Sequence, residues 1–195
     1  MLKKQLLKKL AITGAVVMGM LTFGGVTQAN AATASPSYGH FTSRTITYHI
    51  NGSSKHWKKV WTKAIHKFDH NGTIKLKATS KKKAKMTMST VVKFKGKDAT
   101  LPYKGSGSGS KKVIKKMHLR LSQKVSGKQV YIEKDNLVVS GTDLEVKYAT
   151  AVIAFGLGLN ESNNIKGSMM NWNEWHANLS SGDKLGLAQA YAHVK

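Results

Sequence analysis

The 195-residue sequence contains no cysteine, which excludes disulfide bonds, a thiolate nucleophile and a lipid-modified cysteine. Acidic residues are also scarce, with nine against 32 lysines and arginines, and the only arginines are Arg44 and Arg120. Because sites that read DNA bases favour the arginine fork over the lysine point charge, sequence-specific nucleic-acid binding is not expected. The lysine surplus predicts attraction to anionic polymers in general, with a merely solubilising surface as the alternative.

The amino terminus has the pattern of a cleavable secretory signal. Lysines at positions 3, 4, 8 and 9 precede an uncharged stretch over residues 10–26, and Ala29-Asn30-Ala31 fits the A-x-A cleavage pattern. The apolar stretch is shorter than the roughly 20 residues that a membrane-spanning helix needs, which disfavours an uncleaved anchor. We therefore predict a signal peptide over residues 1–31 and a secreted protein, extracellular or held loosely at the cell wall by its charge.

After the signal, a flexible arm is expected over residues 32–40, followed by one domain over residues 41–195. Alternating apolar and polar residues predict strands in this domain, because a strand points successive side chains to opposite faces. The predicted strands span residues 45–50, 73–79, 85–91 and 116–123, with a further extended or hairpin segment over residues 129–139. The glycine–serine run at residues 105–110 has no such pattern and is predicted to be a flexible loop.

Three helices are predicted, the first from apolar residues that recur every three or four positions, the second from a mostly apolar segment typical of a buried helix, and the third as a closing helix after a capping residue. They begin at Ser53 or Ser54, at Asp143, which caps residues 144–157 before Gly158, and at Ser181 or Asp183. Trp57 and Trp61 fall on the apolar face of the first helix, where core packing is more common than a nucleic-acid or membrane contact. Together the elements predict an α+β fold in which helices pack on a mixed sheet.

Short motifs follow one another in a fixed order over most of the domain. They are an opening strand TITYHI, a helix HWKKVWTKAIHKF, a strand KMHLRLSQ, a helix ending FGLGLNES, a turn GSMMN and a last helix LSSGDKLGLAQAYA. In this order they resemble the matrixins, a branch of the metzincin zinc peptidases. The resemblance implies a mixed twisted sheet with two packed helices, then a methionine-containing Met-turn with Met170 at the position beneath the metal, and a C-terminal helix.

Matrixins hold a catalytic zinc with the motif HExxHxxGxxH, whose first two histidines share one helix face. Aligned on Gly158, the motif places its zinc ligands at Ala151, Phe155 and Glu161, and its general base at Val152. All four catalytic identities are gone, and a lone carboxylate is not a zinc site, which needs three protein ligands. No cofactor is therefore expected, although zinc is the metal of the family, and Phe155 is expected to fill the former ion pocket.

Other residues offer weaker candidates for a metal or binding site. His118 and His176 are considered as partners of Glu161 in a rebuilt metal site near the cleft. The candidates for binding at a cleft rim or at the surface are Trp172, Trp175, Lys81, Lys82 and Lys83. The two tryptophans have packing under the last helix as an equal alternative.

Three functional hypotheses follow. The favoured one is a secreted, monomeric pseudoprotease, a matrixin-like domain that lacks zinc ligands and general base and binds anionic cell-envelope polymers or extracellular proteins. The second is an active extracellular zinc metalloendopeptidase with unrecognised ligands. It needs a new site, because loss of a general base alone costs about 10²–10⁴-fold in rate. The third is a generic cationic protein that binds polyanions.

Overall fold

The computed structural model describes residues 33–132, 137–161, 165–171, 176 and 178–195. The predicted signal at residues 1–31 lies outside these ranges. The elements are β1 (His40–Phe41), β2 (Thr45–Asn51), α2 (Lys55–His66), β3 (Lys75–Ala78), β4 (Met86–Val91), η1 (Gly96–Asp98), β5 (Tyr103–Ser110), β6 (Val113–Ser122), η2 (Gln123–Val125), β7 (Gln129–Ile132), β8 (Leu137–Ser140), α3 (Gly141–Gly156) and α4 (Ser181–Ala190). The predicted α+β class is confirmed. None of the helices in the described ranges is long and apolar enough to cross a membrane.

The main sheet is mostly parallel. Its strand order is β1-β6-β4-β2-β3, and β5 pairs with β6 as well. Every neighbouring pair is parallel except β5 and β6, which are antiparallel. Strands β7 and β8 form a separate antiparallel hairpin, which confirms the hairpin expected over residues 129–139.

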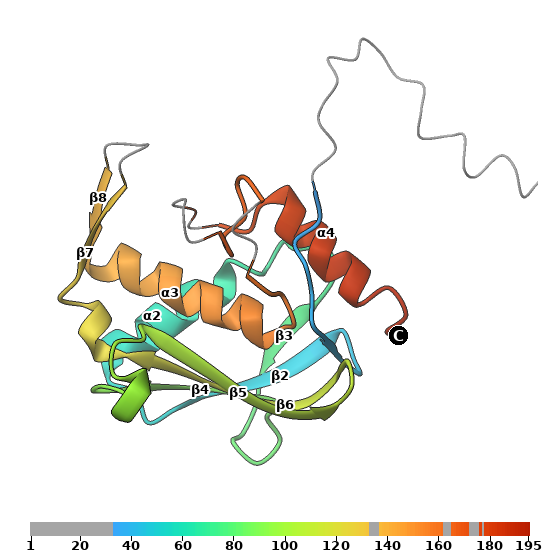
Figure 1. Ribbon diagram of the computed structural model, residues 1–195. Coiled ribbons are helices and arrows are strands. Elements are labelled where there is room, and N and C mark those ends of the chain that lie inside the picture. The colour runs from blue at the N-terminus through green and yellow to red at the C-terminus, as the bar shows by residue number, and fades with distance from the viewer. Residues whose placement is uncertain (1–32, 133–136, 162–164, 172–175, 177) are drawn as a thin grey trace, which may run out of the picture. The chain divides into compact units, whose positions relative to one another are not determined.

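Helices α2 and α3 lie on the same side of this sheet (Figure 1). The apolar residues that alternate along β4 and β6 point toward these helices and are buried; they are Met86, Met88, Met117, Leu119 and Leu121. Trp57 and Trp61 of α2 are buried in the same core, as predicted. The strand alternation therefore separates a helix-covered face of the sheet from an open face.

The helix ends follow local capping chemistry. Ser54 caps α2, since its Oγ accepts a hydrogen bond from the Trp57 N–H at 3.4 Å. The cap of α3 is Ser140 rather than the predicted Asp143, which lies in the first turn, where its carboxylate faces the positive end of the helix dipole. Gly158 ends α3 as predicted. Its φ is 107°, and a Cβ there would lie 1.8 Å from the Gly39 carbonyl oxygen.

The glycine–serine run at residues 105–110 belongs to strand β5, so the prediction of a flexible loop was wrong. Its backbone pairs with β6 from Tyr103 opposite Leu121 to Ser110 opposite Val113, with a bulge after Ser108. The neighbouring strand imposes the extended conformation, since a run of glycine and serine has no side-chain pattern of its own.

The segment before β1, predicted to be a flexible arm, is docked instead. The Ser35 N–H donates to the Gly182 carbonyl at 2.9 Å, and the Tyr38 N–H donates to the Gly158 carbonyl at 2.8 Å. Close approach to α4 requires glycine there, because a Cβ on Gly186 would lie 2.3 Å from the Ser35 carbonyl oxygen. This order comes from distant partners, which the composition of the segment does not reveal.

Candidate functional site

Three of the positions that the resemblance assigns to the zinc motif, Ala151, Val152 and Phe155, lie on α3, close to the edge strand β5, and Glu161 follows the end of this helix. Ala151 and Val152 are fully buried in the core, and Phe155 is partly buried. The Phe155 ring rests on the backbone of β5, since a Cβ added to Gly105 would lie 2.6 Å from its Cε1 atom. An aromatic side chain therefore fills the space between α3 and β5 at the second ligand position.

Tyr38 holds Phe155 from the other side. Its hydroxyl donates a hydrogen bond to the Phe155 carbonyl oxygen at 2.7 Å, and the two ring centroids are 5.1 Å apart. Burial raises the pKa of Tyr38 to about 12, so its hydroxyl stays protonated at neutral pH and remains a donor. Phe155 is thus fixed between the docked N-terminal segment and the edge strand.

Two pockets flank the Phe155 ring. One of ≈ 230 Å³ extends toward Tyr38 and the end of β5 at Gly109. The other, of ≈ 440 Å³, extends toward the start of β5 and Glu161. Both pockets are lined by Gly105 and Phe155, so the ring stands between them.

The larger pocket combines aromatic rings with one carboxylate. The rings of Tyr103 and Tyr148 have their centroids 6.3 Å apart, and burial raises the pKa of both phenols. The charge of Glu161 raises the pKa of Tyr103 further. Both hydroxyls are therefore protonated at neutral pH and act as hydrogen-bond donors, and Glu161 is the carboxylate of the pocket.

Met170 lies in a buried turn that Asp183 anchors. The Met169 N–H donates to Asp183 Oδ2 at 2.9 Å, and the hydroxyls of Ser168 and Ser35 donate to Oδ1, each at 2.6 Å. Asp183 also completes the capping box of α4 with Ser180. One buried carboxylate therefore ties together the N-terminal segment, the methionine turn and α4. Met170 itself belongs to the same hydrophobic core as Ala151.

His118 does not join the cleft, so the idea that it converges with Glu161 was wrong. It lies on the open face of the sheet, where its Nδ1 is 2.7 Å from Thr87 Oγ1, because its neighbours Met117 and Leu119 point toward the helices. Among the described residues, no group of three or more histidine, cysteine, aspartate or glutamate side chains is placed to hold a metal ion. His176 is one of these described residues; its side chain is partly exposed and belongs to no such group.

The remaining candidates lie elsewhere. Lys81, Lys82 and Lys83 are exposed in the turn between β3 and β4, as a surface role requires. Trp172 and Trp175 lie outside the described residues.

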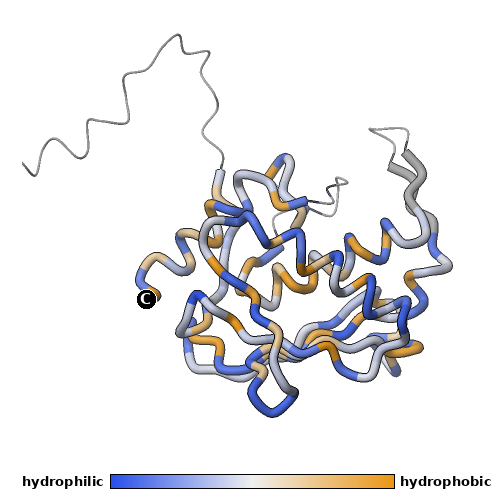
Figure 2. Tube along the Cα trace, turned by 180° about the vertical axis from the view of Figure 1, so that it is seen from behind, coloured by the Kyte–Doolittle hydropathy of each residue, from blue (hydrophilic) through white to orange (hydrophobic). Residues whose placement is uncertain are grey.

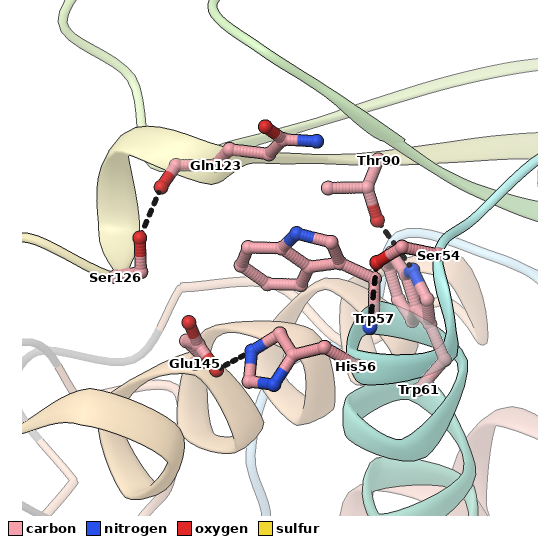
Figure 3. Close-up of polar contacts among 8 residues, drawn as sticks. All are labelled: Ser54, His56, Trp57, Trp61, Thr90, Gln123, Ser126 and Glu145. Atoms are coloured by element: carbon pink, nitrogen blue, oxygen red, sulfur yellow. Dashed lines mark hydrogen bonds and ion pairs between the residues drawn. The ribbon is translucent and has the colours of Figure 1, made fainter.

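Sequence reasoning missed a histidine–carboxylate pair at the start of α3 (Figure 3). His56 Nε2 lies 2.7 Å from Glu145 Oε2, and the Glu145 side chain is only 2% exposed. The nearby serine hydroxyls are bonded to the backbone, Ser54 to the Trp57 N–H and Ser126 to the Gln123 carbonyl. The pair is therefore not extended into a serine nucleophile relay. No local pattern joins His56 to a residue so far along the chain.

No protein-family model and no curated protein matches this chain. Its function has to be argued from the site.

Proposed function

We propose that this protein is a secreted, matrixin-like pseudoprotease that binds at the cell envelope and does not hydrolyse peptides. The observation that carries the proposal is the Phe155 ring on the backbone of Gly105, at the position where the resemblance puts a zinc ligand. The neighbouring motif positions, Ala151 and Val152, are equally apolar and fully buried.

The arrangement of elements supports the resemblance. A mixed sheet carries two packed helices, and a buried methionine turn precedes the C-terminal helix α4, in the order that a matrixin-like chain implies. Asp183 holds that turn through hydrogen bonds that need no metal ion. In the proposal, the fold is therefore stable without the zinc ion that the peptidases bind.

Hydrolysis requires groups that the proposed site lacks. A zinc peptidase needs a metal-activated water and a general base within hydrogen-bond reach of it. Val152, at the general-base position of the motif, cannot accept a proton, and the protonated phenols of Tyr103 and Tyr148 are poor bases at neutral pH. Glu161 is the carboxylate of this pocket, and in the proposal it has no metal-bound water to activate. A peptidase with unrecognised ligands stays the alternative, and the lack of a three-ligand cluster in the described part of the chain weighs against it.

The geometry favours binding of an extended polypeptide along β5. In the described part of the sheet β5 pairs with β6 alone, so no other described strand covers its second edge. An extended chain can add to such an edge while its side chains enter the pockets on either side of Phe155. In the proposal, the cleft thus keeps the capacity to bind a polypeptide and has lost the means to cut it.

The test is the zinc content of the purified protein, measured beside a casein digestion. We expect far less than one zinc per chain and no casein cleavage, even after zinc is added. Near-stoichiometric zinc that a chelator removes, together with cleavage that the chelator abolishes, would overturn the proposal in favour of an active metallopeptidase.

A further inference from the structure

The open face of the main sheet lies opposite α2 and α3, and no described helix covers it (Figure 1). This is unusual for a mostly parallel sheet, because such sheets are normally buried on both faces. The exposure of this face is explained if a binding partner covers it when the protein functions. The side chains on the face indicate its chemistry.

The strands present cations and hydroxyls to this face. Strands β2 to β6 contain no aspartate or glutamate. Exposed or half-exposed polar side chains on the open face include Lys75, Lys77, Lys85, Lys104, Lys116, Arg120, Thr47, His49, Thr87, His118, Ser89, Ser106 and Ser108. One carboxylate, Asp98 of η1, reaches the margin of the face and pairs with Lys104. The face is therefore strongly cationic, with hydroxyl groups between the charges.

The register places three lysines in one row across the strands. Lys77 lies opposite Thr47, the Lys85 N–H donates to the Thr47 carbonyl at 3.0 Å, and the Met117 N–H donates to the Lys85 carbonyl at 2.9 Å. Lys85 therefore lies opposite Lys116, the residue before Met117. With strands about 4.8 Å apart, the row from Lys77 to Lys116 spans about 15 Å.

The turn between β3 and β4 extends this row. It carries Lys81, Lys82 and Lys83 and projects from the sheet on the side away from the helices (Figure 1). Figure 2 shows the same projecting turn as one of the most hydrophilic parts of the trace. The Thr47 hydroxyl donates to the Lys83 carbonyl at 3.0 Å, which ties the turn to the sheet.

Among the described side chains of this face there is no exposed phenylalanine, tyrosine or tryptophan ring. Its one aromatic contact is internal, since the Arg120 guanidinium lies 5.6 Å from the ring centroid of Phe94, which is buried. Single-stranded nucleic acids bind through bases stacked on exposed aromatic side chains as well as through phosphates. Lysines and hydroxyls suit a chain that offers phosphates alone.

We infer that this lysine face, formed by Lys75, Lys77, Lys81, Lys82, Lys83, Lys85, Lys104, Lys116 and Arg120, binds a linear polyol-phosphate polymer, a chain of phosphodiesters without bases. The lysines neutralise successive phosphates, and the serine hydroxyls of Ser89, Ser106 and Ser108 between them donate hydrogen bonds to phosphate oxygens. The inference is independent of the cleft, because it uses the opposite face of the sheet.

The test is a fluorescence-anisotropy titration of the purified protein with a labelled glycerol-phosphate oligomer. The variant Lys77→Gln, Lys85→Gln, Lys116→Gln removes three charges from the row. The variant Lys58→Gln, Lys59→Gln, Lys63→Gln removes the same charge from exposed positions on α2 and serves as the matched control. Circular dichroism and thermal unfolding establish that both variants fold. A third variant with arginine at positions 77, 85 and 116 keeps the charge.

We expect the sheet variant to bind about tenfold or more weakly, and its log–log salt slope to fall by about 2, as for three lost phosphate contacts. The helix variant changes affinity by less than about threefold, and the arginine variant keeps binding. Equal losses in both glutamine variants, or no loss in either, would overturn the inference. An oligodeoxynucleotide with the same number of phosphates is the comparison probe, and tighter binding of it at the same lysines would overturn the choice of polymer.

Discussion

The two faces of the main sheet are built from alternate residues of the same strands, yet they carry side chains of different chemistry. Along β6, Met117, Leu119 and Leu121 enter the core under α3, while His118 and Arg120 point to the open face. The covered face carries the cleft around Phe155, and the open face carries the lysine row. Because the strand period separates the two sets of side chains, either surface can change in sequence without disturbing the other.

The largest effect is expected at Gly158, where the helix of the covered face ends. In Gly158→Ala, the Cβ meets the Gly39 carbonyl oxygen at 1.8 Å, and the residue keeps a φ of 107°. Strain of about 1–3 kcal/mol adds to this collision, so the free energy of unfolding should fall by about 4 kcal/mol or more. Urea unfolding measures it.

Gly127→Ala is the control for this substitution, because a Cβ at Gly127 meets nothing within 4 Å. Its effect should stay within about 0.5 kcal/mol. Equal stability of the two variants would show that the N-terminal segment is not docked against Gly158.

Neighbouring residues of β6 provide the next test of the comparison. Leu119→Ala should lower the free energy of unfolding by about 2–5 kcal/mol, because it leaves a cavity under α3. His118→Ala removes only an exposed contact with Thr87 and should cost less than about 1 kcal/mol. Urea unfolding of both variants checks the difference, and a reversed order would mean that the strand presents the other face to the core.

A lysine in the covered layer should behave differently from one on the open face. Lys147 of α3 is only 4% exposed, and burial lowers its pKa from 10.5 to about 8. The unfolded chain therefore holds the proton more tightly, and the free energy of unfolding should rise between about pH 8 and 10.5. Any gain in stability from Lys147→Met at pH 7 should therefore shrink by about 1–3 kcal/mol as the pH rises from about 8 to 10.5.

Lys116→Met on the open face is the matched control, since its side chain is exposed. Thermal unfolding at several pH values compares the two variants. A gain for Lys147→Met that does not vary with pH would contradict the burial of its charge.

The smallest effect concerns two histidine–carboxylate pairs, each with an N–O distance of 2.7 Å. The side chains of His56 and Glu145 are 51% and 2% exposed, whereas those of His66 and Asp69 are 65% and 51% exposed. His56→Ala leaves a buried carboxylate without its partner and should cost about 1–3 kcal/mol. His66→Ala should cost less than about 1 kcal/mol. Equal costs in urea unfolding would argue that Glu145 is solvated.

Local patterns predicted much of this fold. The alternation over β2, β4 and β6 and the three- and four-residue spacing of α2 identified these elements, because each buries one face of its own. Helix α3 was identified from its mostly apolar composition, and most of its residues are buried. The same alternation separates His118 from the helix-covered face, and it is the signal that excludes this histidine from the cleft.

The missed features depend on partners far along the chain. Strand β5 is extended because β6 pairs with it, and its glycines have no side chains that record this. Gly105 gives no local sign that Phe155 rests on it, and Tyr38 gives none that it bonds the Phe155 carbonyl. The centre of the candidate site was therefore predicted from Phe155 alone, without the residues that hold its ring.

The most direct measurement of the central claim is zinc binding by a variant that restores the motif, Ala151→His, Val152→Glu, Phe155→His and Glu161→His. We expect this variant to bind one zinc per chain and its melting temperature to rise with zinc, since a ligand bound only to the folded state stabilises it. The unchanged protein should show neither effect. A folded variant that binds no zinc, or an unchanged protein that binds it equally well, would contradict the account.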